Sequence, residues 1–116
     1  MLLAREYLES AGWSDVVDVS SKQPFDYLCT KGGIPFSVEV KGTVSSGEKI
    51  ILTQGEVNHH RKVYPNNALV VVSGITLEGD GNDEAMGGAV SLLSPWAIDD
   101  LRLQPVSYFY DVYPDH

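Results

Sequence analysis

The sequence predicts one α/β domain over residues 1–116, of the α+β kind with a mixed sheet, from three local patterns. Residues 2 to 11 carry apolar side chains at the spacing of one helix face. A Gly32-Gly33 pair then marks a tight hairpin. Finally, Thr53 opens a capping box ahead of an apolar run at 68–73. The predicted order is helix, strand, hairpin, helix, strand.

The first helix is expected to stop at Gly12, which suits the residue just past a helix end. It starts at the first residue without an N-cap, which suggests that the natural chain extends further upstream. Residues 16 to 19 are expected to form a short strand, and residues 20 to 23 connect it to the hairpin.

The hairpin strands are predicted at 25–31 and 34–41, because a two-residue turn fixes their register. In this register Phe25 faces Val40, Tyr27 faces Val38 and Cys29 faces Phe36, which gives one continuous apolar face.

The other face of the hairpin carries charge. Asp26 is predicted to lie directly opposite Glu39, and Lys41 points the same way as Glu39. Opposed carboxylates repel at a separation of about 5 Å between Cβ atoms, unless a cation lies between them. A divalent metal is the obvious cation. The simpler interpretations are surface carboxylates on a solvated face and a plain salt bridge for Lys41.

These residues match a known signature. Pro24-Phe25-Asp26, the hairpin and Glu39-Val40-Lys41 together resemble the P-D…(D/E)-x-K pattern of restriction-endonuclease-like nucleases. The strings Val38 to Thr43 and Leu52 to Val57 look more particularly like the carboxy-terminal domain of the NO VEIN family. The resemblance covers roughly residues 12 to 73. It implies a restriction-endonuclease-like αβββαβ core, here with an extra C-terminal strand or arm.

The resemblance also implies a chemistry, which is Mg²⁺- or Mn²⁺-dependent hydrolysis of phosphodiester bonds by a DNA endonuclease domain of a restriction or defence-type system. Asp26, Glu39 and Lys41 would be catalytic, and Asp26, Glu39 and the Val40 carbonyl would hold the metal. Relatives often add a first-helix acid, for which Glu6 is the candidate although it lies close to Gly12. The alternative is a nuclease fold that no longer cleaves and acts as a binding or assembly module.

The second helix is expected to end near Tyr64, because Pro65 follows. Gln54 and Glu56 in its first turn are accessory candidates, with Glu56 more naturally a capping residue. The neighbouring His59 and His60 diverge by about 100° on a helix and cannot share a metal. They are expected to face phosphate or water.

The net charge of −8 opposes binding to nucleic acid, but its distribution is uneven. Residues 22 to 62 hold six Lys and Arg against four Asp and Glu, a local balance of +2. The domain alone should therefore bind DNA weakly, and a homodimer or a larger parent assembly would add affinity. The candidate phosphate-binding residues are Lys22, Lys49, Arg61 and Lys62.

The rest of the chain suggests less about function. Residues 76–88 read as an acidic loop, 89–93 as a further strand and 105–113 as a last strand or an extended aromatic arm. The lone Cys29 permits no internal disulfide, which favours the reducing cytoplasm. No secretory signal and no apolar run of membrane-spanning length occur.

Overall fold

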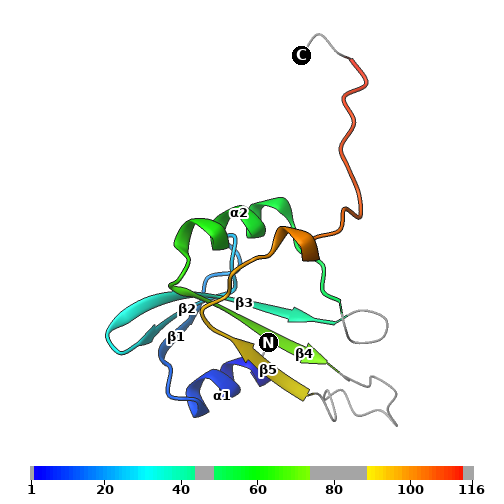
Figure 1. The fold of residues 1–116 in the computed structure, drawn as a ribbon. Coiled ribbons are helices and arrows are strands. Elements are labelled where there is room, and N and C mark those ends of the chain that lie inside the picture. Colours follow the sequence, from blue (N-terminus) through cyan, green and yellow to red (C-terminus); the bar gives the residue numbers. More distant parts are fainter. Residues whose placement is uncertain (1, 44–48, 74–88, 114–116) are drawn as a thin grey trace.

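The computed structural model describes residues 2–43, 49–73 and 89–113. Its elements follow the predicted order (Figure 1). They are α1 (Leu2–Ser10), β1 (Ser14–Asp18), β2 (Tyr27–Lys31), β3 (Ile34–Gly42), α2 (Gln54–Val63), β4 (Asn67–Ser73), β5 (Ala89–Leu93) and a short 3₁₀ helix, η1 (Asp100–Arg102). The predicted loop at 76–88 and most of the loop after Thr43 lie outside the described residues.

The sheet is mixed, with its five strands in the order β1-β2-β3-β4-β5. The first three strands form an antiparallel meander, and β4 runs parallel to β3 after the α2 crossover. β5 returns antiparallel to β4. The α+β class, the mixed sheet and the αβββαβ order are confirmed, and this arrangement is compatible with a nuclease-like core.

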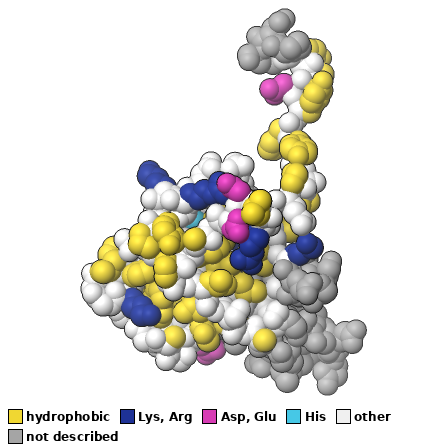
Figure 2. Space-filling model, viewed as in Figure 1, with side chains coloured by type: hydrophobic (Ala, Val, Ile, Leu, Met, Phe, Trp, Pro, Cys, Tyr) yellow, Lys and Arg dark blue, Asp and Glu magenta, His cyan; other side chains and the backbone are white. Residues whose placement is uncertain are grey.

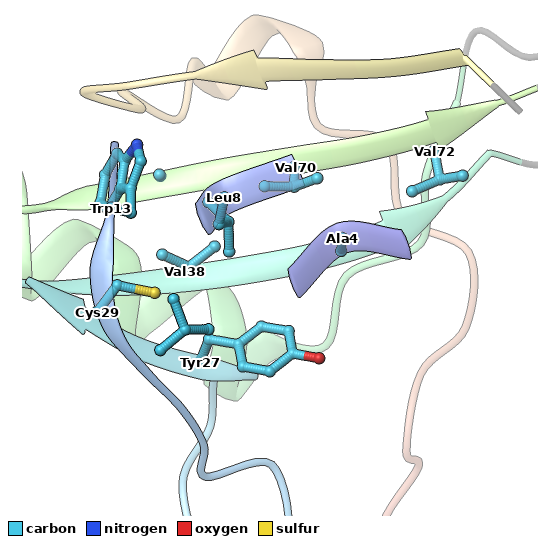
Figure 3. Close-up of a cluster of buried hydrophobic side chains, with 10 residues drawn as sticks. Ala4, Leu8, Trp13, Tyr27, Cys29, Val38, Val70 and Val72 are labelled. Atoms are coloured by element: carbon cyan, nitrogen blue, oxygen red, sulfur yellow. The ribbon is translucent and has the colours of Figure 1, made fainter. Parts of the chain in front are cut away.

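The hydrophobic core lies between α1 and one face of the sheet (Figure 3). Leu8 and Ala4 of α1 pack there on the inward side chains of the strands. Alternation along β2 and β3 puts Tyr27, Cys29 and Val38 on this face, as predicted. The helix α2 covers the opposite face of the sheet (Figure 1), and the polar side chains of β3 point toward it.

The start of β2 differs from the prediction. The β2–β3 ladder begins at Tyr27, opposite Val38, and Asp26 N also donates to Val38 O at 3.0 Å. Two consecutive residues thus meet one partner, a bulge-like irregularity that reverses the alternation of side chains. Phe25 therefore does not face Val40. It is buried on the α2 side, stacked on His59 with ring centroids 4.6 Å apart.

The first strand starts two residues earlier than predicted, at Ser14. Its pairing with β2 shifts between Ser14 and Val17, where Asp15 has a φ of 52°. Gly12 has a φ of 94°, which explains why a glycine ends α1 as predicted.

The C-terminal segment after η1 is an extended arm, and the alternative of a last strand is wrong (Figure 1). Hydrophobic side chains line this arm outside the body of the domain (Figure 2). Phe109 is fully exposed, and Val106, Tyr108, Tyr110 and Val112 are each more than two-thirds exposed.

Candidate metal centre

The candidate site lies between β3 and α2. Ser37, Glu39 and Lys41 alternate with the core residues of β3, so their side chains all face α2. The helix covers Glu39 to 1% exposure. Glu39 is thus not a solvated surface carboxylate, and the site is a covered polar layer.

Asp26 reaches this layer from the residue before β2. Its Oδ2 accepts a hydrogen bond from Val40 N at 2.8 Å. The ladder partner that would otherwise satisfy Val40 N is missing, because the regular pairing of β2 begins at Tyr27. The Asp26 side chain therefore completes the end of the β2–β3 ladder, with its carboxylate beside Glu39.

The pKa of Glu39 is raised from 4.5 to about 9 by burial first, and then by a hydrogen bond with Asp26 and the charge of Asp26. Two neighbouring carboxyl groups can share a hydrogen bond only when one of them carries a proton. Glu39 is therefore a neutral acid at pH 7 when no other cation is present.

Lys41 binds a different acid from the one expected. Its Nζ lies 2.9 Å from Glu56 Oε1 and 3.9 Å from Glu39 Oε2. Burial alone would raise the pKa of Glu56, but the Thr53 backbone N–H and the Lys41 ammonium outweigh it and lower that pKa. Glu56 also closes the capping box of α2 with Thr53, as predicted.

A second set of polar contacts lies behind Glu39. His60 Nε2 lies 3.0 Å from Glu39 Oε1, and His60 Nδ1 lies 3.2 Å from Asn67 Nδ2. Asn67 in turn makes two hydrogen bonds to the backbone of Trp96. His60 and Asn67 have no exposed surface, and burial lowers the pKa of His60 to about 4. The ring is therefore neutral at pH 7.

The prediction that both histidines face phosphate or water is wrong. His60 points into the protein onto Glu39, and His59 Nε2 lies 3.0 Å from Ser37 Oγ while its ring stacks on Phe25. Both side chains fill the space between α2 and the sheet, because the helix packs on that face along its length.

The remaining predicted residues lie around this layer or away from it. Glu6 is exposed on α1, which packs on the other face of the sheet. Gln54 is exposed at the start of α2 and donates to Asn58 Oδ1 at 2.9 Å. Val40 is half-buried, with its N–H on Asp26.

Two of the four predicted phosphate-binding residues already have partners. Arg61 forms an ion pair with Asp100 of η1, and Lys49 Nζ donates to Gln104 Oε1 at 3.3 Å. Lys22 and Lys62 are exposed. In the described ranges, no three or more His, Cys, Asp and Glu side chains are arranged to hold a metal ion.

The chain matches the family model of the C-terminal part of the protein NO VEIN over residues 1–83. This match covers well over half of the sequence. The chain belongs to the NO VEIN C-terminal family. No curated protein and no solved structure matches it.

The family match includes Asp26, Glu39, Lys41, His60 and Asn67, whereas Trp96, η1 and the arm lie beyond it. Apart from Trp96, the residues of the candidate site therefore all lie in the part of this NO VEIN C-terminal domain that matches the family. Among the described helices, none has the length and apolar character to cross a membrane.

Sequence reasoning missed His60 and Asn67 as members of the site. One signal could have revealed His60: the capping box sets the helix start, and His60 then follows Val57 by three positions on the inward face. Asn67 carries no such signal, because its role depends on the backbone of Trp96, which is distant in sequence.

Proposed function

We propose that this domain hydrolyses phosphodiester bonds of nucleic acid with the help of Mg²⁺ or Mn²⁺, as a DNA endonuclease domain of a restriction or defence-type system. The observation that carries the proposal is the pair of carboxyl groups of buried Glu39 and half-buried Asp26, beside Lys41. This pair binds a proton far more tightly than ordinary carboxylates do, and it would bind a divalent cation in the same place.

The donor set suits Mg²⁺, which commonly takes one or two carboxylates and completes its octahedral shell with water and substrate oxygens. Asp26 and Glu39 would supply the carboxylates, and the Val40 carbonyl is a further candidate ligand. When bound, the cation activates water and offsets charge on the phosphate oxygens. The half-buried position of Asp26 leaves one side of the pair open to substrate.

Lys41 would stabilise the phosphate during the reaction. Its ammonium group is half-buried between Glu56 and Glu39, so a substrate phosphate would have to compete with Glu56 for it. Glu56 thus serves as a counter-ion that holds Lys41 in place in the absence of substrate. Gln54 at the start of α2 and the more distant Glu6 remain accessory candidates.

Binding of nucleic acid would use the positive balance of residues 22–62, and Lys22 and Lys62 are the exposed cations available for it. Arg61 and Lys49 would first have to leave Asp100 and Gln104. We therefore expect weak binding by the isolated domain, strengthened in a homodimer or a larger parent assembly. The single, buried Cys29 fits a place in the cytoplasm.

Incubation of supercoiled plasmid DNA with the domain and Mn²⁺ tests this function. We expect nicking that Asp26→Ala and Lys41→Ala each reduce at least 100-fold. Lys31→Ala serves as the matched control, since Lys31 lies over the Trp13 ring on the other side of the sheet. Equal nicking by all four proteins would trace the cleavage to a contaminant and remove the support for catalysis.

The second candidate function is a binding or assembly module that keeps the fold without cleavage. Two observations favour a module without cleavage. Lys41 already has an ion-pair partner in Glu56 without substrate, and Glu39 is almost completely buried. Calorimetry separates the two functions. A catalytic site binds Mn²⁺ with an affinity that Glu39→Gln weakens, whereas a module without a metal site shows no such dependence.

A further inference from the structure

A buried hydrogen-bonded chain runs from the backbone of Trp96 to Glu39, and its direction can be worked out atom by atom. Trp96 N lies 3.1 Å from Asn67 Oδ1, and Trp96 O lies 2.9 Å from Asn67 Nδ2. A backbone N–H only donates and a backbone carbonyl only accepts. The Asn67 amide therefore has one orientation, with its oxygen toward Trp96 N and its NH₂ group toward Trp96 O.

The Asn67 amide then fixes the protonation of His60. Asn67 Nδ2 is a donor, and besides Trp96 O it faces His60 Nδ1 at 3.2 Å and the His60 carbonyl oxygen at 3.4 Å. A ring nitrogen that faces this NH₂ group is the acceptor. A neutral imidazole carries its single proton on the other nitrogen. The His60 proton therefore lies on Nε2, the atom 3.0 Å from Glu39 Oε1.

We propose that His60 and Asn67 are positioning residues that hold Glu39 as a metal ligand. The His60 N–H occupies Glu39 Oε1 and fixes the rotation of the carboxyl group. Oε2, the oxygen 3.9 Å from Lys41 Nζ, is left for the cation. The part concerning the cation rests on the proposed function, whereas the direction of the hydrogen bonds does not.

Burial explains why the direction matters. Glu39, His60 and Asn67 are each at most 1% exposed, so water cannot replace a lost partner. If His60 carried its proton on Nδ1 instead, that N–H would face the Asn67 NH₂ group and the Nε2 lone pair would face the Glu39 oxygen. The bond from Asn67 would be lost, and the contact with Glu39 would turn repulsive unless that oxygen were protonated. A cation ligand must be unprotonated, so only the Nε2–H form supports metal binding.

Nitrogen NMR of the ¹⁵N-histidine-labelled, metal-free protein tests the direction without any variant. We expect His60 with a protonated Nε2 and an unprotonated Nδ1 at pH 7. Asn67→Asp replaces the donor by an acceptor and should move a proton onto Nδ1. An Nδ1–H form of His60 in the wild-type protein would overturn the inference.

Mn²⁺ affinity, measured by calorimetry, tests the positioning role. Loss of a hydrogen bond behind a metal ligand typically weakens binding 10–100-fold, and we expect about that loss for His60→Leu and Asn67→Asp. His60→Gln retains an N–H donor and should recover most of the affinity, which a general packing role would not explain. His59→Gln is the matched control, since His59 contacts Ser37 and not Glu39.

Thermal unfolding by circular dichroism establishes that each variant is folded before titration, and Asn67→Asp carries the test if His60→Leu does not fold. Unchanged Mn²⁺ affinity in both Asn67→Asp and His60→Leu would overturn the positioning role alone. A wild-type protein that binds no Mn²⁺ would overturn the proposed function and the cation part of the inference together. The NMR result distinguishes these cases, because it is obtained without metal.

Discussion

Glu39 is a carboxyl group that folding keeps protonated, and the pH dependence of stability should show it. Its pKa is raised from 4.5 to about 9, so the folded state holds a proton that the unfolded chain releases between these values. Stability contributed by such a group is complete below the unfolded pKa and is lost as the pH rises through the folded pKa. His60 acts oppositely, because its pKa falls from 6.5 to about 4.

Above pH 6.5 only the Glu39 effect remains, so the free energy of unfolding of the metal-free protein should fall steadily toward pH 9. Glu39→Gln should flatten this decline, since an amide resembles the neutral carboxyl group. Urea unfolding at several pH values above 6.5 measures the decline in the wild-type protein and in Glu39→Gln. Glu9→Gln, an exposed change on α1, should keep the wild-type slope. An equally steep decline in Glu39→Gln would contradict the shared proton.

At the same scale, the sequence predicted part of the pairing in the hairpin. The hairpin register correctly paired Tyr27 with Val38 and Cys29 with Phe36. It was wrong for Phe25, because the ladder begins at Tyr27, two residues later than predicted, beside a bulge that alternation cannot reveal. The meeting of Asp26 with Glu39 depends on the hydrogen bond that Val40 N donates to the Asp26 side chain rather than on regular pairing.

Among the elements, α2 has the clearest local signals, and its capping box links stability to the site. Thr53→Ala removes the acceptor for Glu56 N and should cost about 1 kcal/mol of stability. It should also loosen Glu56, the counter-ion of Lys41. Urea unfolding measures the loss, and Thr53→Ser should retain most of the wild-type stability. A Thr53→Ala protein as stable as the wild type would show that the cap contributes nothing.

Elements with local signals were predicted closely, and those fixed by distant contacts were not. The bounds of α1, α2, β3 and β5 match their predicted ranges to within a residue or so, since capping, turn and apolar patterns lie within a few residues. The start of β1 depends on its pairing with Thr30 across a bulge. The burial of the polar face under α2 was not predicted, because nothing local states where a helix packs.

At the scale of the whole molecule, the arm after η1 is the part of the described chain least tied to the fold. Phe109 and its neighbours are exposed, so deletion of residues 106–116 should change the free energy of unfolding by no more than about 0.5 kcal/mol. The cut leaves the Lys49–Gln104 hydrogen bond in place. Chemical unfolding measures the stability, and sedimentation of both forms tests whether the arm mediates the proposed homodimer. A large loss of stability would contradict a purely peripheral arm.

The central claim for the molecule is that a divalent cation replaces the proton between Asp26 and Glu39. Calorimetric titration with Mn²⁺ at pH 7, in two buffers of different ionisation enthalpy, counts the protons released on binding. We expect about one proton per Mn²⁺ bound for the wild-type protein, because Glu39 is protonated at that pH. Glu39→Gln should bind at least tenfold more weakly and release none. Binding without proton release, at the same affinity in both proteins, would contradict the account.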